Sequence, residues 1–293
     1  MGMPATARVT TVRVERATFS GVSRVTVWLS AALAAVGAVV SATTFFFWGV
    51  LRDNPGAVGN LRGTCLAMLV VAVPVLVASM VLSARGSLAA RVVWLAALGY
   101  FVYNSVLLNF AMFFNSFFFL WVAMLSLSVW SFFLLLRDID VEAIRAQASR
   151  VPARVIAAYL LLSLVVYAIP WLKGAMPGVL HNTSPAAFAG TRLLTSPVWV
   201  LDFAFSFPLL ALSAVWIWRR AGWGYVAGGA LIMMLTIETS SVAIDQVFGH
   251  RHDPAQSLGS VPLMIALTVV GLVMSVLYLR GFRESSRQSA ATL

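Results

Sequence analysis

Long apolar runs, each about the length of a membrane-spanning helix, recur along the whole 293-residue chain. A helix rises about 1.5 Å per residue, so about 20 apolar residues cross the hydrocarbon core of a bilayer. Hydrophobic residues make up 61% of the chain and charged residues 10%, whereas soluble domains average about 45–50% and about 25%. The composition excludes a soluble enzyme, a disulfide scaffold and a disordered chain, because no soluble core of this size could cover so much apolar surface.

Eight segments are long enough to span a bilayer. The apolar run over residues 92–136 would measure about 68 Å as one helix, twice a bilayer, so it must break, and Asn115-Ser116 is the natural turn. The predicted spans cover residues 25–50, 64–83, 92–112, 116–136, 155–172, 196–218, 223–244 and 261–279. We therefore expect an all-α polytopic transmembrane bundle of about eight helices.

The predicted organisation is a single bundle domain over residues 25–280, between a basic tail (1–24) and a short C-terminal tail (281–293). The first apolar run is too long for a cleavable signal peptide, so we expect it to remain as a helix. The loop over residues 137–154 carries acidic and basic residues and is expected to form a short surface helix on anionic lipid. We find no convincing internal repeat, because dividing the chain into two four-helix halves aligns no matching residues.

The basic residues predict the orientation in the membrane. The two tails and the even-numbered loops hold 15 of the 20 basic residues, and the odd-numbered loops hold 5. Cytoplasmic loops carry an excess of Lys and Arg. We therefore expect a multi-pass protein of the cell membrane with both termini in the cytoplasm. The net charge of +10 is explained by these flanking residues and does not indicate nucleic-acid binding.

Two acidic residues inside the apolar runs are the most informative positions. A carboxylate at mid-bilayer costs about 2.5–3.5 kcal/mol on insertion scales, so such residues usually face the interior of the bundle and serve a function. Asp202 lies in the sixth predicted span with Ser206 on the same helical face. Pro208 follows and should kink that helix. Asp202 and Ser206 are candidate ligands of a substrate or ion.

The second acidic residue, Glu238, lies in the seventh predicted span. Glu238 shares a helical face with Asp245 by i+7 spacing, and both are further candidate ligands. The short turn between the sixth and seventh spans makes these helices antiparallel neighbours, with Asp202 and Glu238 at the same depth. The two carboxyl groups could share a proton, hold a cation, pair separately with a basic residue such as Arg192, or merely tie helices together.

Three histidines, His181, His250 and His252, fall in predicted outer loops. Imidazole groups can bind zinc or copper, so His250 and His252 are candidate metal ligands, and the alternative is a solvated loop. No histidine or lysine lies within a predicted span, which excludes a bis-histidine haem and a retinal Schiff base. The chain lacks a P-loop, an HExxH motif and a GxSxG motif. We expect no cofactor, and no enzymatic activity is indicated.

Other polar and aromatic residues are expected to be structural. Tyr100 and Asn104 have i, i+4 spacing in the third span and are expected to hold helices together. Trp171 lies near a predicted outer helix end and is assigned to the aromatic belt.

Several stretches resemble a group of prokaryotic multi-pass membrane proteins of uncharacterised activity. The resemblance is carried by four stretches, namely LGYFVYN (98–104), FNSFFFLWVAMLSLS (114–128), SPVWVLDFAFSFP (196–208) and RRAGWGY (219–225). It implies an Asp and a Pro in the sixth span, matching Asp202 and Pro208. It also implies a lysine in the seventh span near Met233 or Met234, which this chain lacks. The resemblance implies no activity.

The leading functional hypothesis is a small proton- or cation-coupled transporter. Its buried carboxyl groups would lie in the outer half of the bundle and bind an unknown small solute or ion. One alternative is a structural or sensory membrane protein. Another is a membrane-embedded enzyme acting on lipid, with His250 and His252 near the headgroups. The sequence predicts the lipid bilayer as a partner and gives no oligomeric state.

Overall fold

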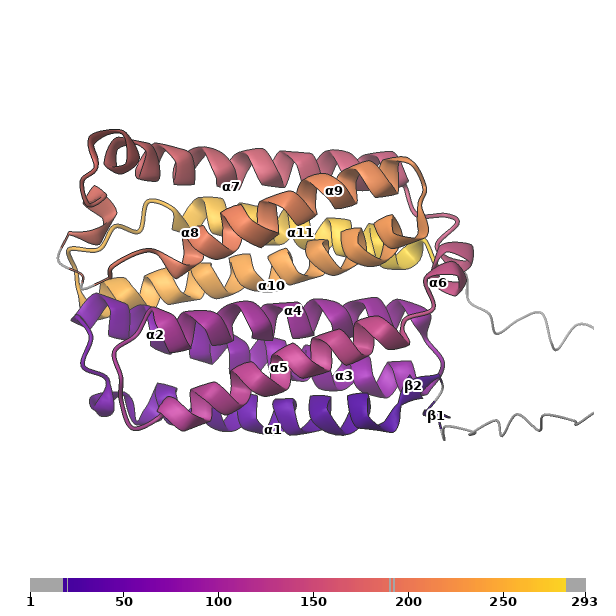
Figure 1. Cartoon of the computed structure of the whole chain (residues 1–293), viewed down its shortest axis with the longest axis horizontal. Coiled ribbons are helices and arrows are strands. Elements are labelled where there is room, and N and C mark those ends of the chain that lie inside the picture. The colour runs from indigo at the N-terminus through magenta and orange to yellow at the C-terminus, as the bar shows by residue number, and fades with distance from the viewer. Residues whose placement is uncertain (1–17, 20, 190, 192, 283–293) are drawn as a thin grey trace, which may run out of the picture.

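The computed structural model describes residues 18–19, 21–189, 191 and 193–282, and within them eight helices are long and apolar enough to cross a membrane. The predicted all-α transmembrane bundle is confirmed (Figure 1). The spanning elements are α1 (Arg24–Phe46), α2–η2–α3 (Pro55–Ala67, Met68–Ala72 and Val73–Ala84), α4 (Leu88–Phe110), α5 (Phe118–Asp138), α7 (Ala153–His181), α8–η4–α9 (Pro197–Leu201, Asp202–Ser206 and Phe207–Trp218), α10 (Gly222–His252) and α11 (Val261–Arg280). Five shorter elements are β1 (Thr18–Phe19), β2 (Val22–Ser23), η1 (Trp48–Val50), α6 (Val141–Gln147) and η3 (Ala186–Phe188).

The predicted break near residue 115 is confirmed. Helix α4 ends at Phe110 and α5 begins at Phe118. Between them, the Asn115 side chain accepts a hydrogen bond from the backbone N–H of Phe117 (2.9 Å) and donates one to the Phe113 carbonyl (2.8 Å). An Asn side chain that bonds to nearby backbone in this way stabilises a turn at the expense of a continuous helix.

The end of the bundle that carries the first and last described residues is tied together by hydrogen bonds. The Asp138 carboxylate accepts from the backbone N–H of Ser23 (2.9 Å) and from the Thr26 hydroxyl (2.6 Å). The Arg150 N–H donates to the Gly281 carbonyl (3.2 Å). The loop after α5 contains helix α6, as predicted. Of the predicted tails, residues 1–17, 20 and 283–293 lie outside the described part of the chain.

Two helices extend beyond their predicted ends and pack against each other there. Helix α2 begins at Pro55, and α10 continues to His252. A methyl group added at Gly63 would lie 2.8 Å from the Asp245 nitrogen, and one added at Gly59 would lie 2.8 Å from the Gly249 Cα. Glycine at these positions therefore lets the two backbones approach closely. Hydropathy missed the extensions because this contact depends on small residues rather than apolar ones.

The two four-helix halves share a constant spacing that the sequence comparison did not detect. Each half contains a five-residue π-helical turn, starting at Met68 and at Asp202, followed by a 12-residue helix whose second residue is proline, Pro74 or Pro208. The next helices, α4 and α10, begin at residues 88 and 222. Both pairs (68 and 202, 88 and 222) differ by 134 positions.

The turns before α4 and α10 repeat the same geometry at the same spacing. Gly86 and Arg220 both have a positive φ, 90° and 57°. The next N–H groups, of Ser87 and Ala221, bond to carbonyls five residues earlier (3.2 and 2.9 Å), which is the pattern of a Schellman motif. The prediction of no internal repeat was therefore wrong for the segment from each π turn into the following long helix.

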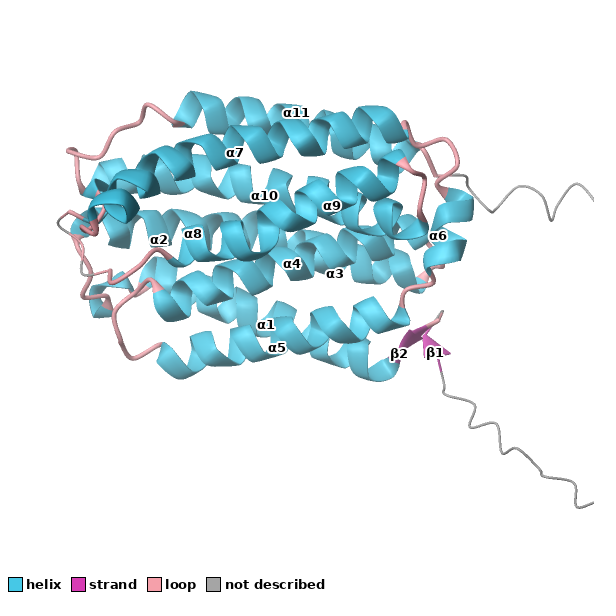
Figure 2. Cartoon of the chain, turned by 45° about the horizontal axis from the view of Figure 1, so that its top comes forward, coloured by secondary structure: helices cyan, strands magenta, loops and turns pink. Residues whose placement is uncertain are grey.

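The halves occupy separate sides of the bundle. Helices α1 to α5 lie together, and α7 to α11 lie together, in both views (Figures 1 and 2). Equivalent helices run in the same direction, because each half contains an even number of spans. Parallel repeats of this kind occur in transporter folds. Helices α4 and α10, which hold corresponding positions in the two halves, pack against each other at the interface between the halves.

Candidate functional site

Asp202 is the first residue of the π-helical turn η4 in the sixth span. The backbone N–H of Phe207 bonds to the Asp202 carbonyl, five residues earlier. Pro208, the residue after Phe207, has no N–H, and in a regular α-helix its ring would clash with the carbonyl of the preceding turn. The predicted interruption at Pro208 is thus present as a widened turn. Single π turns inside α-helices occur frequently at functional sites.

Three side chains surround the Asp202 carboxyl group. The Tyr103 hydroxyl donates to Oδ1 (3.2 Å) and the Trp171 indole N–H donates to Oδ2 (2.6 Å). The Ser206 hydroxyl lies beside the same carboxyl group. Asp202 thus joins α4, α7 and η4, and Ser206, the other predicted candidate on this helix, belongs to the same cluster.

Glu238 lies near the middle of α10 and contacts the equivalent position of the other half. Asn104 is 134 residues before Glu238, and its Nδ2 donates to Oε2 of Glu238 (2.8 Å). Nδ2 also donates to the Tyr100 carbonyl (3.2 Å), which fixes the orientation of the amide. This hydrogen bond joins α4 of one half to α10 of the other, so Glu238 lies at the interface between the halves.

The Asn104 amide also has an unused acceptor. Its Oδ1 atom is buried without a hydrogen-bond partner, and the residue is 1% exposed. Buried polar atoms rarely lack a partner, and a water molecule, an ion or a protonated group commonly provides it. The amide that bonds Glu238 thus keeps an acceptor atom that could take one further hydrogen bond.

Asp245 continues the acidic face of α10 toward the end that carries His252. Its Oδ2 is 3.4 Å from the Thr64 hydroxyl of α2. Between the two acids, Ser241 accepts a hydrogen bond from the Tyr100 hydroxyl (3.1 Å). Glu238 and Asp245 are seven residues apart, or about 10 Å along the helix.

The three carboxyl groups form one electrostatic cluster. Glu238 is close enough to both Asp202 and Asp245 for their charges to interact. The hydrogen bonds place Ser206 and Asp202 in one cluster, and they connect Asp202 and Glu238 to the same turn of α4 through Tyr103 and Asn104. These adjacent residues bind one acid each.

None of the three carboxyl groups pairs with a basic side chain in the described residues. The two ion pairs found there join Arg137 to Asp138 and Arg145 to Glu142, at the opposite end of the bundle. Arg192, considered above as a partner for Asp202, lies outside the described residues. The acids are instead bonded to hydroxyl, indole and amide groups.

The two candidate metal ligands have other partners. His252 lies with Nδ1 3.0 Å from the Phe248 carbonyl and Nε2 2.8 Å from Arg62 Nη1. This arrangement fits a neutral ring that donates through Nδ1 and accepts through Nε2. His250 Nδ1 lies 2.7 Å from the Gln256 carbonyl. Among the described residues, no three His, Cys, Asp or Glu side chains lie together as a metal site would need.

Sequence reasoning missed the roles of Tyr103, Asn104 and Trp171. Trp171 was assigned to the aromatic belt, and Asn104 was treated as helix packing. The signal available for Asn104 was its i, i+4 spacing with Tyr100. No spacing rule indicated which helix the Trp171 indole would face.

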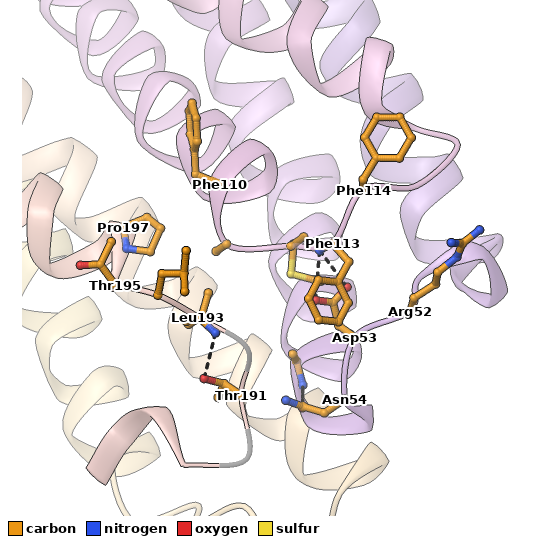
Figure 3. A pocket seen from close by; sticks show the side chains of 14 residues that line it. Arg52, Asp53, Asn54, Phe110, Phe113, Phe114, Thr191, Leu193, Thr195 and Pro197 are labelled. Carbon is orange, nitrogen blue, oxygen red and sulfur yellow. Dashed lines mark hydrogen bonds between the residues drawn. The ribbon is translucent and has the colours of Figure 1, made fainter. Parts of the chain in front are cut away.

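A cavity of about 890 Å³ lies where the C-terminal end of α4 meets the segments that precede α2 and α8 (Figure 3). Its lining includes Asp53, Phe110, Phe113, Leu193 and Pro197. The volume falls within the range of small-molecule sites, about 300–1,000 Å³. We call this cavity the vestibule.

The vestibule contains one carboxyl group among the residues that line it. Asp53 accepts from the Phe113 N–H at both oxygens (3.2 and 3.3 Å). Burial raises the pKa of Asp53 above its ordinary value, although these hydrogen bonds oppose the shift.

Comparison of the chain with protein-family models, curated proteins and solved structures found no match. The function must therefore be argued from the site alone.

Proposed function

We propose that this integral membrane protein is a proton-coupled transporter in which Asp202 and Glu238 bind and release protons. The observation that carries the proposal is the unpaired state of these carboxyl groups among the described residues. A buried carboxylate without a cationic partner is costly in a bilayer. It becomes stable when it takes up a proton or when a cation compensates its charge, and an exchange between these states can drive transport.

The residues around the acids favour a proton over a bare metal cation. Metal cations such as Ca²⁺ or Mg²⁺ need several oxygen ligands. The groups next to Asp202 and Glu238 include the Trp171 indole and the Asn104 Nδ2, which donate hydrogen bonds and cannot bind a cation. A proton needs no such oxygen cage.

The repeat supports transport over a purely structural role. Interrupted helices in corresponding positions of two repeats are typical of transporters, whose sites lie at the interface between the repeats. Here both interruptions are π turns followed by proline, and Glu238 lies at the interface between the halves. A merely structural carboxyl group would need neither feature.

The excess of basic residues at one end of the bundle supports the predicted orientation in the membrane, in which both termini are cytoplasmic. The structure places both described chain ends and the arginine-rich connections at the same end of the bundle (Figure 1). By the positive-inside rule this end faces the cytoplasm of a cell membrane. The acids, the vestibule and the histidines then lie toward the outer side.

The test is proton movement in proteoliposomes that contain an internal pH-sensitive dye. A panel of small solutes is added outside, and protein-dependent changes of internal pH are recorded. Asp202→Asn and Glu238→Gln should abolish the response, because an amide cannot carry the proton. Glu142→Gln is the matched control, since Glu142 is exposed at the other end. All variants are first checked for insertion and a monodisperse elution profile.

The outcome separates the candidate functions. A response that persists in both acid-to-amide variants would contradict the proposal. If no solute gives a response, and both variants only lower thermal stability, the protein would be structural or sensory, with its acids holding helices together.

A further inference from the structure

We propose that the vestibule and Asp202 form a binding path for a lipophilic organic cation, which exchanges for protons at the buried acids. The transport part of this inference rests on the proposed function, whereas binding in the vestibule does not.

The vestibule and Asp202 are placed by the same two helices. Pro197 lines the vestibule and is five residues before Asp202, about 7.5 Å along the helix. Phe110 also lines it and is seven residues after Tyr103, which binds Asp202. That separation is about 10 Å along α4. A solute in the vestibule is therefore about two helical turns from the acid cluster.

The vestibule opens at one of two equivalent helix seams. In the repeat, α2 corresponds to α8, and α10 corresponds to α4. The contact of α2 with α10 therefore corresponds to the contact of α4 with α8. The first seam is packed closely through Gly59 and Gly63, while α4 touches α8 over a short stretch only. In this proposal the solute passes from the vestibule to Asp202 along the contact of α4 with α8.

The chemistry along this route suits a cation with an apolar body. Asp53 offers a carboxyl group that makes no ion pair among the described residues, and Asp202 offers another farther in. Phe110, Phe113 and Leu193 supply aromatic and apolar surface. Aromatic faces attract organic cations, and this attraction increases where water is excluded.

Among the described residues, one basic residue lines the vestibule, and it lies at the rim. The Arg52 side chain is exposed and extends away from Leu193 and Pro197 (Figure 3). Its charge opposes a bound cation from a distance and is screened by water. Removing that charge should therefore strengthen cation binding modestly.

An organic cation also fits the hydrogen-bond donors at Asp202. A bare metal ion needs a cage of oxygens, whereas an ammonium or phosphonium group needs only negative charge and apolar walls. A carboxylate compensated by a proton in one state can be compensated by such a cation in the other. The exchange leaves no uncompensated charge in the bilayer.

The test uses two probes of the same shape and opposite charge, tetraphenylphosphonium and tetraphenylborate. Binding to the purified full-length protein in detergent is measured by equilibrium dialysis, with protein-free micelles as the baseline. Tetraphenylphosphonium should bind saturably, and Asp53→Asn should weaken it about fivefold, the upper end for a partly exposed charge pair. The amide retains an acceptor for the Phe113 N–H, so the loop geometry is kept.

Further variants locate the site. Asp202→Asn should weaken tetraphenylphosphonium binding, Arg52→Gln should strengthen it, and Glu142→Gln should leave it unchanged. Neither acid-to-amide variant should weaken the binding of tetraphenylborate. Equal binding of both probes, unaffected by Asp53→Asn and Asp202→Asn, would overturn the proposal and indicate partition into the micelle.

The two proposals fail separately. If tetraphenylphosphonium binding does not depend on Asp53 or Asp202, but proton movement in proteoliposomes still requires Glu238, the proposed substrate class is wrong and the proposed function stands. If binding requires Asp53 but no proton moves with any solute, the cation site stands and coupled transport is wrong.

Discussion

The glycine contact between α2 and α10 allows a quantitative test of the packing. In Gly63→Ala the new methyl group would lie 2.8 Å from the Asp245 nitrogen and 2.9 Å from the Ile244 carbonyl oxygen. These are backbone atoms, so the helices must move apart. Overpacking of this kind costs about 1–3 kcal/mol, and the higher helix propensity of alanine offsets about 0.5–1 kcal/mol. Taking the middle of each range, the net loss is about 1 kcal/mol.

The assay is thermal unfolding of the purified protein in detergent, followed by tryptophan fluorescence. At about 2–4 °C per kcal/mol, Gly63→Ala should lower Tm by about 2–4 °C. The matched control is Gly228→Ala on α10, where the nearest atoms are side-chain methyl groups at 3.4 and 3.5 Å. That variant should be neutral or slightly more stable. Equal stability of Gly63→Ala and the wild type would refute the close contact.

Three further predictions concern the repeat, the terminal ties and the vestibule. Arg220→Gly should raise stability in thermal unfolding by about 0.5–1 kcal/mol, because Arg220 has the positive φ that its equivalent Gly86 adopts without strain; a loss of stability would contradict the matched turns. Asp138→Ala should cost about 2 kcal/mol, because it leaves the N–H of Ser23 and the hydroxyl of Thr26 without their acceptor, and an unchanged Tm would count against that tie. For Asp53, the raised pKa means that the folded state binds more protons than the unfolded state above about pH 4. The stability of the wild type should therefore fall relative to that of Asp53→Asn as pH rises through the raised pKa. A difference in Tm that does not change with pH would contradict this prediction.

Much of the fold could be predicted from the sequence because the bilayer imposes strong rules. The apolar runs gave the number of spans, and the turn at Asn115 followed from the length of the run over residues 92–136. The buried acids Asp202 and Glu238 stood out because charge is rare and costly in such segments. These inferences depend on composition along the chain and need no knowledge of lateral packing.

The repeat and the partners of the acids could not be predicted in the same way. Few residues match between the halves, although the helix lengths and turn geometry do, so residue identity was a poor guide. The extent of α2 and α10 depends on contact at Gly59 and Gly63, which hydropathy does not record. The position of Trp171 beside Asp202 depends on how α7 rotates against η4, which periodicity within one helix does not specify.

The most direct test of the central claim is an infrared measurement of the Glu238 carboxyl group in the membrane. Difference spectra between two pH values are recorded for the wild type and for Glu238→Gln, with Glu142→Gln as control. We predict a carboxylic-acid C=O band that changes with pH in the wild type and in the control, and that is absent in Glu238→Gln. Identical difference spectra for the wild type and Glu238→Gln would contradict a proton-carrying role for this residue.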